Sequence, residues 1–387
     1  MYSEQDLQTA IAAGAITEEA AQALRDHVAA TRATPFVDEE NFRLISGFND
    51  IFVAIAAIIL LVAVWWIGSA LQSDVKDYTS ALPGVFGEGT KFGDYQDRAK
   101  GMGGLLCALA AWLLAEYFTR KRRMAFPSII LLGAFVIGIA SALNGFYLDW
   151  DYTKYGYAQS WQNTALAPLA EARSQRLMLV YSAIGLFTAV AAYAHWRRFH
   201  VPIAVAALAA AVGAVILFGL FYLFDVQTYN STAALTPILI LGVAIFAFAM
   251  WWDMSDKKRE TGRSDVAFWL HLLAAPLIAH PLFALIGVTQ GDSIGIGAII
   301  GVLAVYLGFC LVALAVDRRA LLVSALAYVL IALTALFRQY GVVELNVAVT
   351  ALIIGSALLL LSAFWTTLRR MIVSKLPREL QGKLPAI

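Results

Sequence analysis

The chain has 387 residues, of which 60% are hydrophobic and only 14% are charged, and its formal net charge is +1. Soluble globular domains carry about a quarter charged residues, so this composition predicts a polytopic membrane protein. The near-zero net charge excludes the basic footprint of a protein that binds nucleic acid. Cys107 and Cys310 both lie in apolar runs, which predicts packing residues and excludes a disulfide framework or a cysteine metal site.

Residues 1–48 are expected to form a small cytosolic helical unit. Ser3 and Asp6 have the spacing of a capping box at the start of a short helix that Gly14 ends. Thr17 is placed to cap a second helix. The first apolar run begins only near residue 50 and has no small-residue cleavage site after it, so we expect this unit to stay attached and not to be a signal peptide.

The stretch "AGAITEEAAQAL" (13–24) combines a helix end with an acidic helix start. It resembles the N-terminal unit of an uncharacterised family of bacterial predicted inner-membrane proteins, in which the unit precedes a string of hydrophobic hairpins with short loops. The resemblance implies a multi-pass protein of the bacterial inner membrane. It implies no activity, so no functional residue is carried over from it.

Ten apolar runs between residues 49 and 367 predict a bundle of ten transmembrane helices. A bilayer core of about 30 Å requires about 20 apolar residues in a helix, and backbone hydrogen bonding in lipid excludes open strands. The runs cover approximately 50–72, 101–119, 126–148, 177–196, 201–224, 232–252, 265–288, 293–316, 320–338 and 344–366.

Basic residues follow every second run. If these basic connections and both termini share one side, that side holds 20 of the 28 lysines and arginines. The positive-inside rule then predicts cytoplasmic N and C termini. The tail, residues 368–387, has five basic residues from Arg369 onward and is expected to lie on the inner membrane surface as a basic amphipathic segment.

Similar residues recur along the chain at a constant offset, which predicts duplicated helical hairpins. Pro127, Gly138, Phe146, Tyr147 and Leu148 recur 75 positions later as Pro202, Gly213, Phe221, Tyr222 and Leu223. Each set follows a basic turn. Such hairpins are parallel repeats and differ from the inverted repeats of many secondary transporters.

Three acidic residues have spacings that suggest a specific role. Glu116 lies four residues before Arg120, the spacing of an ion pair on one helix face. Asp149 and Asp151 have a spacing seen in nucleotide-sugar sites that bind metal, but two carboxylates alone are common, and their loop is predicted to lie outside the cell. We therefore discount a metal site there.

The seventh run, "FWLHLLAAPLIAHPLF" (268–283), contains the candidate functional residues His271, Pro276, His280 and Pro281. The two histidines are nine residues apart, so they fall on opposite faces of a straight helix and cannot bind one metal together. Three interpretations stay open: a packing helix with neutral histidines, a solute or proton path, and a haem held by His271 and His195.

The prolines make a specific prediction about this run. Each removes an amide hydrogen and crowds the carbonyl four residues back, which frees the carbonyls of Leu272 and Leu277. Free carbonyls at membrane depth are tolerated only inside protein or beside water. We therefore expect the helix to bend at Pro276 or Pro281 and His280 to face the bundle interior.

Gly297 and Gly301 in the eighth run have the spacing of a close helix contact, within the bundle or between protomers. The sequence thus predicts an all-helical integral membrane protein that is transporter- or channel-like for a small or lipidic solute. The alternative is a membrane-embedded interaction or assembly protein, whose N-terminal unit binds a partner. An enzyme is the least supported class, and no cofactor or metal is expected. The expected partners are the lipid bilayer, a protein at the N-terminal unit and further copies of the chain.

Overall fold

The computed structural model describes residues 4–33, 48–71, 97–155, 167–226, 231–257, 259, 261–287, 296–319, 321–322, 326, 329–330, 346–382 and 384–385. In these residues the regular elements are all helical, which confirms the predicted all-helical fold class. The chain divides into two compact units, residues 1–42 and residues 43–387.

The first unit contains two helices, α1 (Glu4–Ala12) and α2 (Glu18–Ala33). The Thr17 hydroxyl accepts a hydrogen bond from the Ala20 amide at 3.1 Å, which confirms the predicted helix cap. Gly14 follows α1 with a φ of +70°, as expected for a glycine that ends a helix. Ser3, the start of the predicted capping box, lies outside the described residues.

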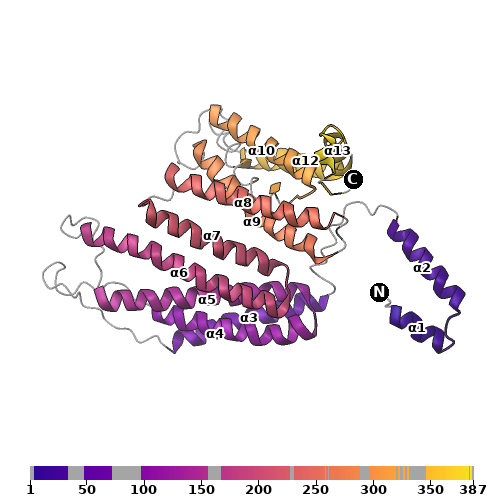
Figure 1. Ribbon diagram of the computed structural model, residues 1–387, viewed down its shortest axis with the longest axis horizontal. Coiled ribbons are helices and arrows are strands. Elements are labelled where there is room, and N and C mark those ends of the chain that lie inside the picture. The colour runs from indigo at the N-terminus through magenta and orange to yellow at the C-terminus, as the bar shows by residue number, and fades with distance from the viewer. Residues whose placement is uncertain are drawn as a thin grey trace. The chain divides into compact units, whose positions relative to one another are not determined.

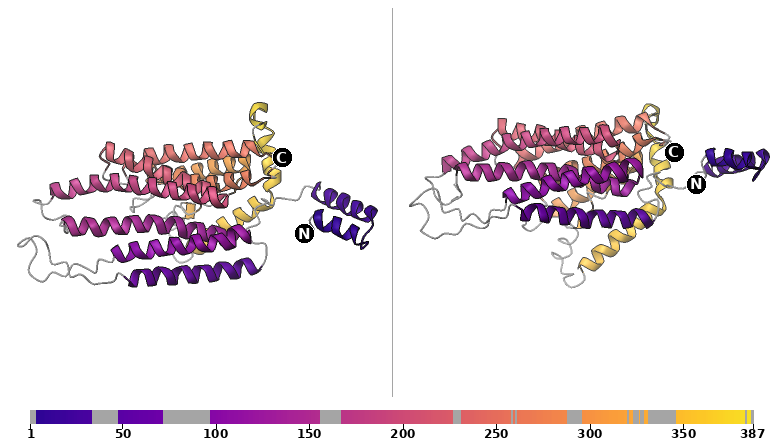
Figure 2. Two further views of the ribbon diagram at one scale, coloured as in Figure 1. Left: turned by 60° about the horizontal axis from the view of Figure 1, so that its bottom comes forward. Right: turned by 90° about the horizontal axis from the view of Figure 1, so that it is seen from below.

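The second unit carries the hydrophobic helices (Figure 1). They are α3 (Phe48–Ala70), α4 (Asp97–Ala115), a π-helical turn η1 (Glu116–Lys121), α5 (Ala125–Tyr155), α6 (Ala167–Phe199), α7 (Ile203–Leu223), α8 (Thr232–Ser255), α9 (Gly262–Leu285), α10 (Ile296–Val316), α12 (Asn346–Ala363), α13 (Trp365–Val373) and α14 (Arg378–Gln381). Helices α3 to α9 run side by side, with successive helices reversing direction (Figure 2).

Among the described residues, eight helices are long and apolar enough to cross a membrane. This supports a multi-pass membrane protein but not the predicted count of ten. The ninth predicted run, 320–338, lies mostly outside the described residues. The tenth is not one straight span, because the chain bends by 69° between residues 352–363 and α13. The bend follows Phe364, where the sequence changes from apolar to basic and amphipathic.

Non-glycine residues in left-handed conformation make several of the connecting turns very short. Arg123, between η1 and α5, has a φ of 53°, and the Met124 amide donates to the Phe118 carbonyl across it at 3.1 Å. Asp225 and Asp317 end α7 and α10 in the same way, with φ values of 49° and 58°. A left-handed L-residue costs roughly 1–2 kcal/mol, so packing of the hairpins must offset that cost.

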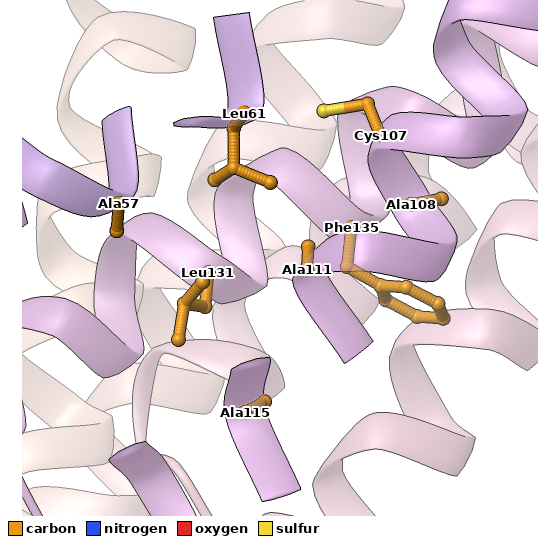
Figure 3. Close-up of a cluster of buried hydrophobic side chains, with 8 residues drawn as sticks. All are labelled: Ala57, Leu61, Cys107, Ala108, Ala111, Ala115, Leu131 and Phe135. Atoms are coloured by element: carbon orange, nitrogen blue, oxygen red, sulfur yellow. The ribbon is translucent and has the colours of Figure 1, made fainter. Parts of the chain in front are cut away.

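Small residues allow α3, α4 and α5 to approach closely. A Cβ atom on Gly104 would lie 2.7 Å from the Gly138 carbonyl oxygen, and one on Gly138 would lie 2.7 Å from the Gly104 carbonyl oxygen. The two backbones are therefore in contact, as in small-residue interfaces of membrane helices. Alanines, Leu61, Leu131 and Phe135 fill the cluster beside this contact, which also encloses Cys107 (Figure 3).

The repeat seen in the sequence does not extend to the packing of its two glycines. Gly138 contacts α4, the partner in its own hairpin, whereas Gly213 faces Leu241 of the following helix α8. In the α6–α7 hairpin the close contact is made by Gly185 against Ala211 and Val215 instead. The two hairpins thus use different residues at their interfaces.

Helix α9 is the most enclosed of the eight candidate spans in the described residues, with half of its apolar window buried. One end packs on α7 and α8, where Leu270 meets Val205 and Ile245. Further along, Phe283 packs with Val302 of α10. Because α9 contacts neighbours on several sides, a polar group on one of its buried faces is shielded from lipid.

Candidate functional site

The four predicted site residues of α9 do not gather at one point. His271 is fully buried and Pro281 is buried, whereas His280 is half-buried and Pro276 is exposed. The helix continues from Gly262 to Leu285 without a break at either proline. Of the four residues, His271 has its side chain in a buried polar cluster.

The cluster joins His271, Asp253 and Arg318. The His271 Nε2 atom lies 2.8 Å from the Asp253 Oδ2 atom. Arg318 donates from Nη2 to Asp253 Oδ1 at 2.5 Å and from Nε to Oδ2 at 3.3 Å. Its Nη2 also donates to the Ser264 carbonyl at 3.1 Å. The three side chains are 0%, 1% and 2% exposed, so the cluster is closed to solvent.

The charges within this cluster balance. The Asp253 carboxylate offsets the Arg318 guanidinium, and a neutral His271 donates its Nε2 hydrogen to the carboxylate. The His271 Nδ1 atom has no hydrogen-bond partner among the described residues, and the Phe246 ring packs against the imidazole at 5.1 Å between centroids. Burial of an unpaired charge is very costly, so removal of either charged side chain would destabilise the folded state.

A second polar cluster borders the first at the segment after α10. Asp317 accepts hydrogen bonds from Arg259 at 2.9 Å and from the Trp365 indole at 2.7 Å. The Arg319 guanidinium lies over the Trp365 ring, 4.9 Å from its centroid. The indole contact holds the start of α13 against the end of α10, next to the bend after α12.

Sequence reasoning missed these two clusters. The basic residues after the sixth and eighth runs, in "DKKRETGR" (256–263) and "DRR" (317–319), enter the sequence analysis only through the positive-inside rule. In the structure, Arg259, Asp317 and Arg318 are each part of a specific interaction. Asp253 directly follows the predicted sixth run (232–252) and was the available signal, because ionisable residues next to a span are functional candidates. Its partner Arg318 is far away in sequence and required the tertiary structure.

The Leu277 carbonyl, predicted to be freed by Pro281, faces α8. A Cβ atom on Gly242 would lie 2.8 Å from the Leu277 carbonyl carbon and 2.9 Å from its oxygen. The carbonyl is thus covered by protein, which agrees with the expectation for a free carbonyl at this depth. Gly242 is the residue that makes this close approach of α8 and α9 sterically allowed.

Gly297 and Gly301, the predicted helix-packing pair, make no comparable backbone contact. Gly297 has open space where a side chain would be, and the nearest atom to a Cβ on Gly301 is a methyl group of Ile286 at 3.3 Å. Close glycine contacts in the described bundle lie instead between α3, α4 and α5, between α6 and α7, between α7 and α8, and between α8 and α9. A contact of Gly297 between protomers stays a prediction.

His195 of α6 lies in a different environment from His271. It is fully buried, and neither ring nitrogen has a hydrogen-bond partner among the described residues. Trp112, Phe135 and Phe199 surround it, with Phe199 closest at 4.5 Å between centroids. The ring and hydrogen-bond contacts of His195 described above share no residue with those of His271, so they give no support to a haem held between the two histidines.

Glu116 and Asp151 both form ion pairs with arginines of α6 that the sequence did not predict. Glu116 accepts from Arg198 of α6 at 2.7 and 2.9 Å, and from Arg120 only at 3.4 Å. Asp151, which is 0% exposed, accepts from Arg173 at 2.8 Å and from Arg176 at 2.7 Å. Both carboxylates thus tie α6 to a neighbouring hairpin, and Asp151 does so at the opposite end of the bundle.

Comparison with known proteins adds no functional assignment. Among the described residues no group of three or more histidine, cysteine, aspartate or glutamate side chains is arranged to hold a metal ion. The buried cluster of Asp253, His271 and Arg318 is therefore the site on which a functional argument can rest. The chain matches no family model, no curated protein and no solved structure.

Proposed function

We propose that the protein is a multi-pass transport protein for a small or lipidic solute, embedded in a bacterial inner membrane. The observation that carries this proposal is the buried cluster of Asp253, His271 and Arg318 in and beside the most enclosed span. Ionisable groups inside a membrane protein are costly, so they are retained mainly where they serve a pathway or a moving part.

On this proposal the cluster acts as a gate, because it joins three segments of the bundle through charged groups. Asp253 of α8 binds His271 of α9 and Arg318, which follows α10. These three segments can therefore separate at this end of the bundle only if the Asp253 contacts break. Uptake of a proton by Asp253 or His271 would leave a net positive charge in a dry site, which weakens the closed arrangement. Proton binding would thereby favour opening.

The orientation of the gate rests on the distribution of basic residues. The bias of 20 of 28 lysines and arginines supports cytoplasmic termini, which places Asp253 and Arg318 toward the cytoplasm. On this proposal His280, half-buried on α9, and the neighbouring Pro276 and Pro281 border the solute path at greater depth.

Cysteine labelling tests the gate. Cys107 and Cys310 are first replaced by alanine, and Ala267→Cys then places a thiol one turn before His271 at a position that is 0% exposed. In inside-out vesicles, a membrane-impermeant maleimide should label this thiol when a pH gradient is applied, and more strongly with Asp253→Asn. The matched control is Ala111→Cys, which is also 0% exposed but lies in the α4 cluster and should stay unlabelled.

A second candidate is an interaction or assembly protein without transport activity. The observation in its favour is that residues 1–42 form a compact unit of their own, separate from the hydrophobic helices. If the thiol at position 267 reacts only after unfolding, the gate proposal fails and this candidate gains support. Removal of residues 1–42 should then reduce the size of the complex extracted from the membrane in mild detergent.

A further inference from the structure

A cavity of about 350 Å³ lies between the turn after η1 and the turn after α6, away from the α9 cluster. It is bordered by the side chains of Thr119, Arg120, Arg123, Arg198 and His200. The two turns each follow a hydrophobic helix, so the cavity lies where the chain leaves the apolar part of the bundle.

The cavity has more positive than negative charge. Three arginines border it, and the acid paired with them is Glu116, which binds Arg198 through two short hydrogen bonds and Arg120 through a longer one. Arg123 makes no ion pair within the described part of the chain. The single Glu116 carboxylate therefore offsets only part of the positive charge of the three arginines. Their guanidinium groups have N–H donors left that can bind a planar or tetrahedral anion.

Thr119 provides a second, independent observation. Its side chain is only 7% exposed and borders the cavity, yet its hydroxyl has no hydrogen-bond partner among the described residues. A buried hydroxyl without a partner is unfavourable by about 1–3 kcal/mol. A bound anion would remove this cost if the Thr119 side chain rotated its hydroxyl toward an anion oxygen.

Two helix N-termini also face the cavity. Met124 and Ala125 at the start of α5, and Val201 and Pro202 at the start of α7, contribute to its walls. Pro202 is the N-cap of α7 and offers no side-chain hydrogen bond to the first amides. The Ala204 and Val205 amides already donate to the Val201 and Pro202 carbonyls. These helix starts therefore contribute mainly the positive end of each helix dipole, which attracts anions.

We propose that this cavity binds a phosphate group, either of an anionic phospholipid headgroup or of a soluble phosphate compound. Arg123 and Arg198 would contact the phosphate oxygens, and the Thr119 hydroxyl would donate to one of them. The position of the cavity at the ends of hydrophobic helices favours the lipid source, because basic pockets between spans on the cytoplasmic side recognise phosphate headgroups.

The test compares binding by the full chain and by single variants. The purified protein is titrated in detergent with phosphatidylglycerol, with phosphatidylcholine and with inorganic phosphate, and its melting temperature is followed. Phosphatidylglycerol should raise the melting temperature, and Arg123→Gln and Thr119→Val should each weaken this effect about tenfold in apparent affinity. Thr119→Val removes an unpaired hydroxyl, so the unliganded protein should remain as stable as before.

Arg122→Gln is the matched control, because Arg122 contacts Tyr117 and does not border the cavity. An equal loss of affinity for Arg122→Gln and Arg123→Gln would overturn the proposal in favour of general surface attraction. A response to inorganic phosphate as large as that to phosphatidylglycerol would support the site and assign it to a soluble ligand. No response to either ligand would also overturn it, and none of these outcomes depends on the α9 gate.

Discussion

Asp253 and Arg318 form a fully enclosed ion pair although 65 positions separate them in the chain. Asp253 lies near the end of α8, and Arg318 follows α10 by two residues. His271 of α9 binds the same carboxylate from another helix. This one carboxylate thus holds together three segments of the bundle.

The first prediction concerns the loss of the arginine. Arg318→Met should lower the free energy of unfolding by about 3–5 kcal/mol, because it leaves the Asp253 carboxylate buried with only a neutral donor. Unfolding of the purified protein by sodium dodecyl sulfate in mixed micelles measures the change. Arg370→Met, an exposed change in α13, serves as the control and should have an effect of less than about 0.5 kcal/mol.

The double variant sharpens this prediction. Asp253→Leu combined with Arg318→Met removes both charges, so the protein should recover most of the stability that Arg318→Met loses. Additive losses in the double variant would show that the two side chains do not depend on each other. The gate interpretation would then lose its structural basis.

The second prediction concerns the contact between α8 and α9. Gly242→Ala should lower the free energy of unfolding by about 1–3 kcal/mol, because the new Cβ atom meets the rigid Leu277 carbonyl at less than 3.0 Å. Gly308→Ala in α10 is the matched control, since nothing lies within 4 Å of the added atom. Alanine improves helix propensity there, so the control should be neutral or slightly more stable.

The third prediction separates the two histidines of α9. His271→Leu should destabilise the protein by about 1–3 kcal/mol, because Asp253 loses a buried hydrogen bond. His280→Leu affects a half-buried side chain and should cost less. Thermal unfolding in detergent compares the two variants directly. A larger loss of stability for His280→Leu than for His271→Leu would contradict the conclusion that His271 makes the main polar contact of α9.

The fourth prediction concerns orientation in the membrane. Green fluorescent protein fused after residue 123, 260 or 387 should fluoresce, and alkaline phosphatase fused after residue 90 or 165 should be active. The reason is that the positive-inside rule predicts cytoplasmic retention of the basic turns at one end of the hairpins. Phosphatase activity from a fusion after residue 260 would contradict both the topology and the cytoplasmic gate.

Much of the architecture was determined by the sequence alone. The apolar runs predict helices because lipid offers no hydrogen-bond partners to the backbone, and the described spans from α3 to α10 fall on the first eight of those runs. Thr17 and Gly14 also have their predicted roles at helix ends, since these roles depend on only a few neighbouring residues. Local preference and hydrophobicity suffice for such features.

The tertiary structure alone decided which polar residues meet. His271 and His280 have similar sequence surroundings, yet it is His271 that binds Asp253 in the cluster with Arg318. Likewise, the i, i+4 spacing of Glu116 and Arg120 predicted their pairing, but Arg198 from α6 is the closer partner. Packing angles between helices determine these pairs, and no pattern within one helix contains that information. The sequence therefore specified the helices, and their packing specified the site.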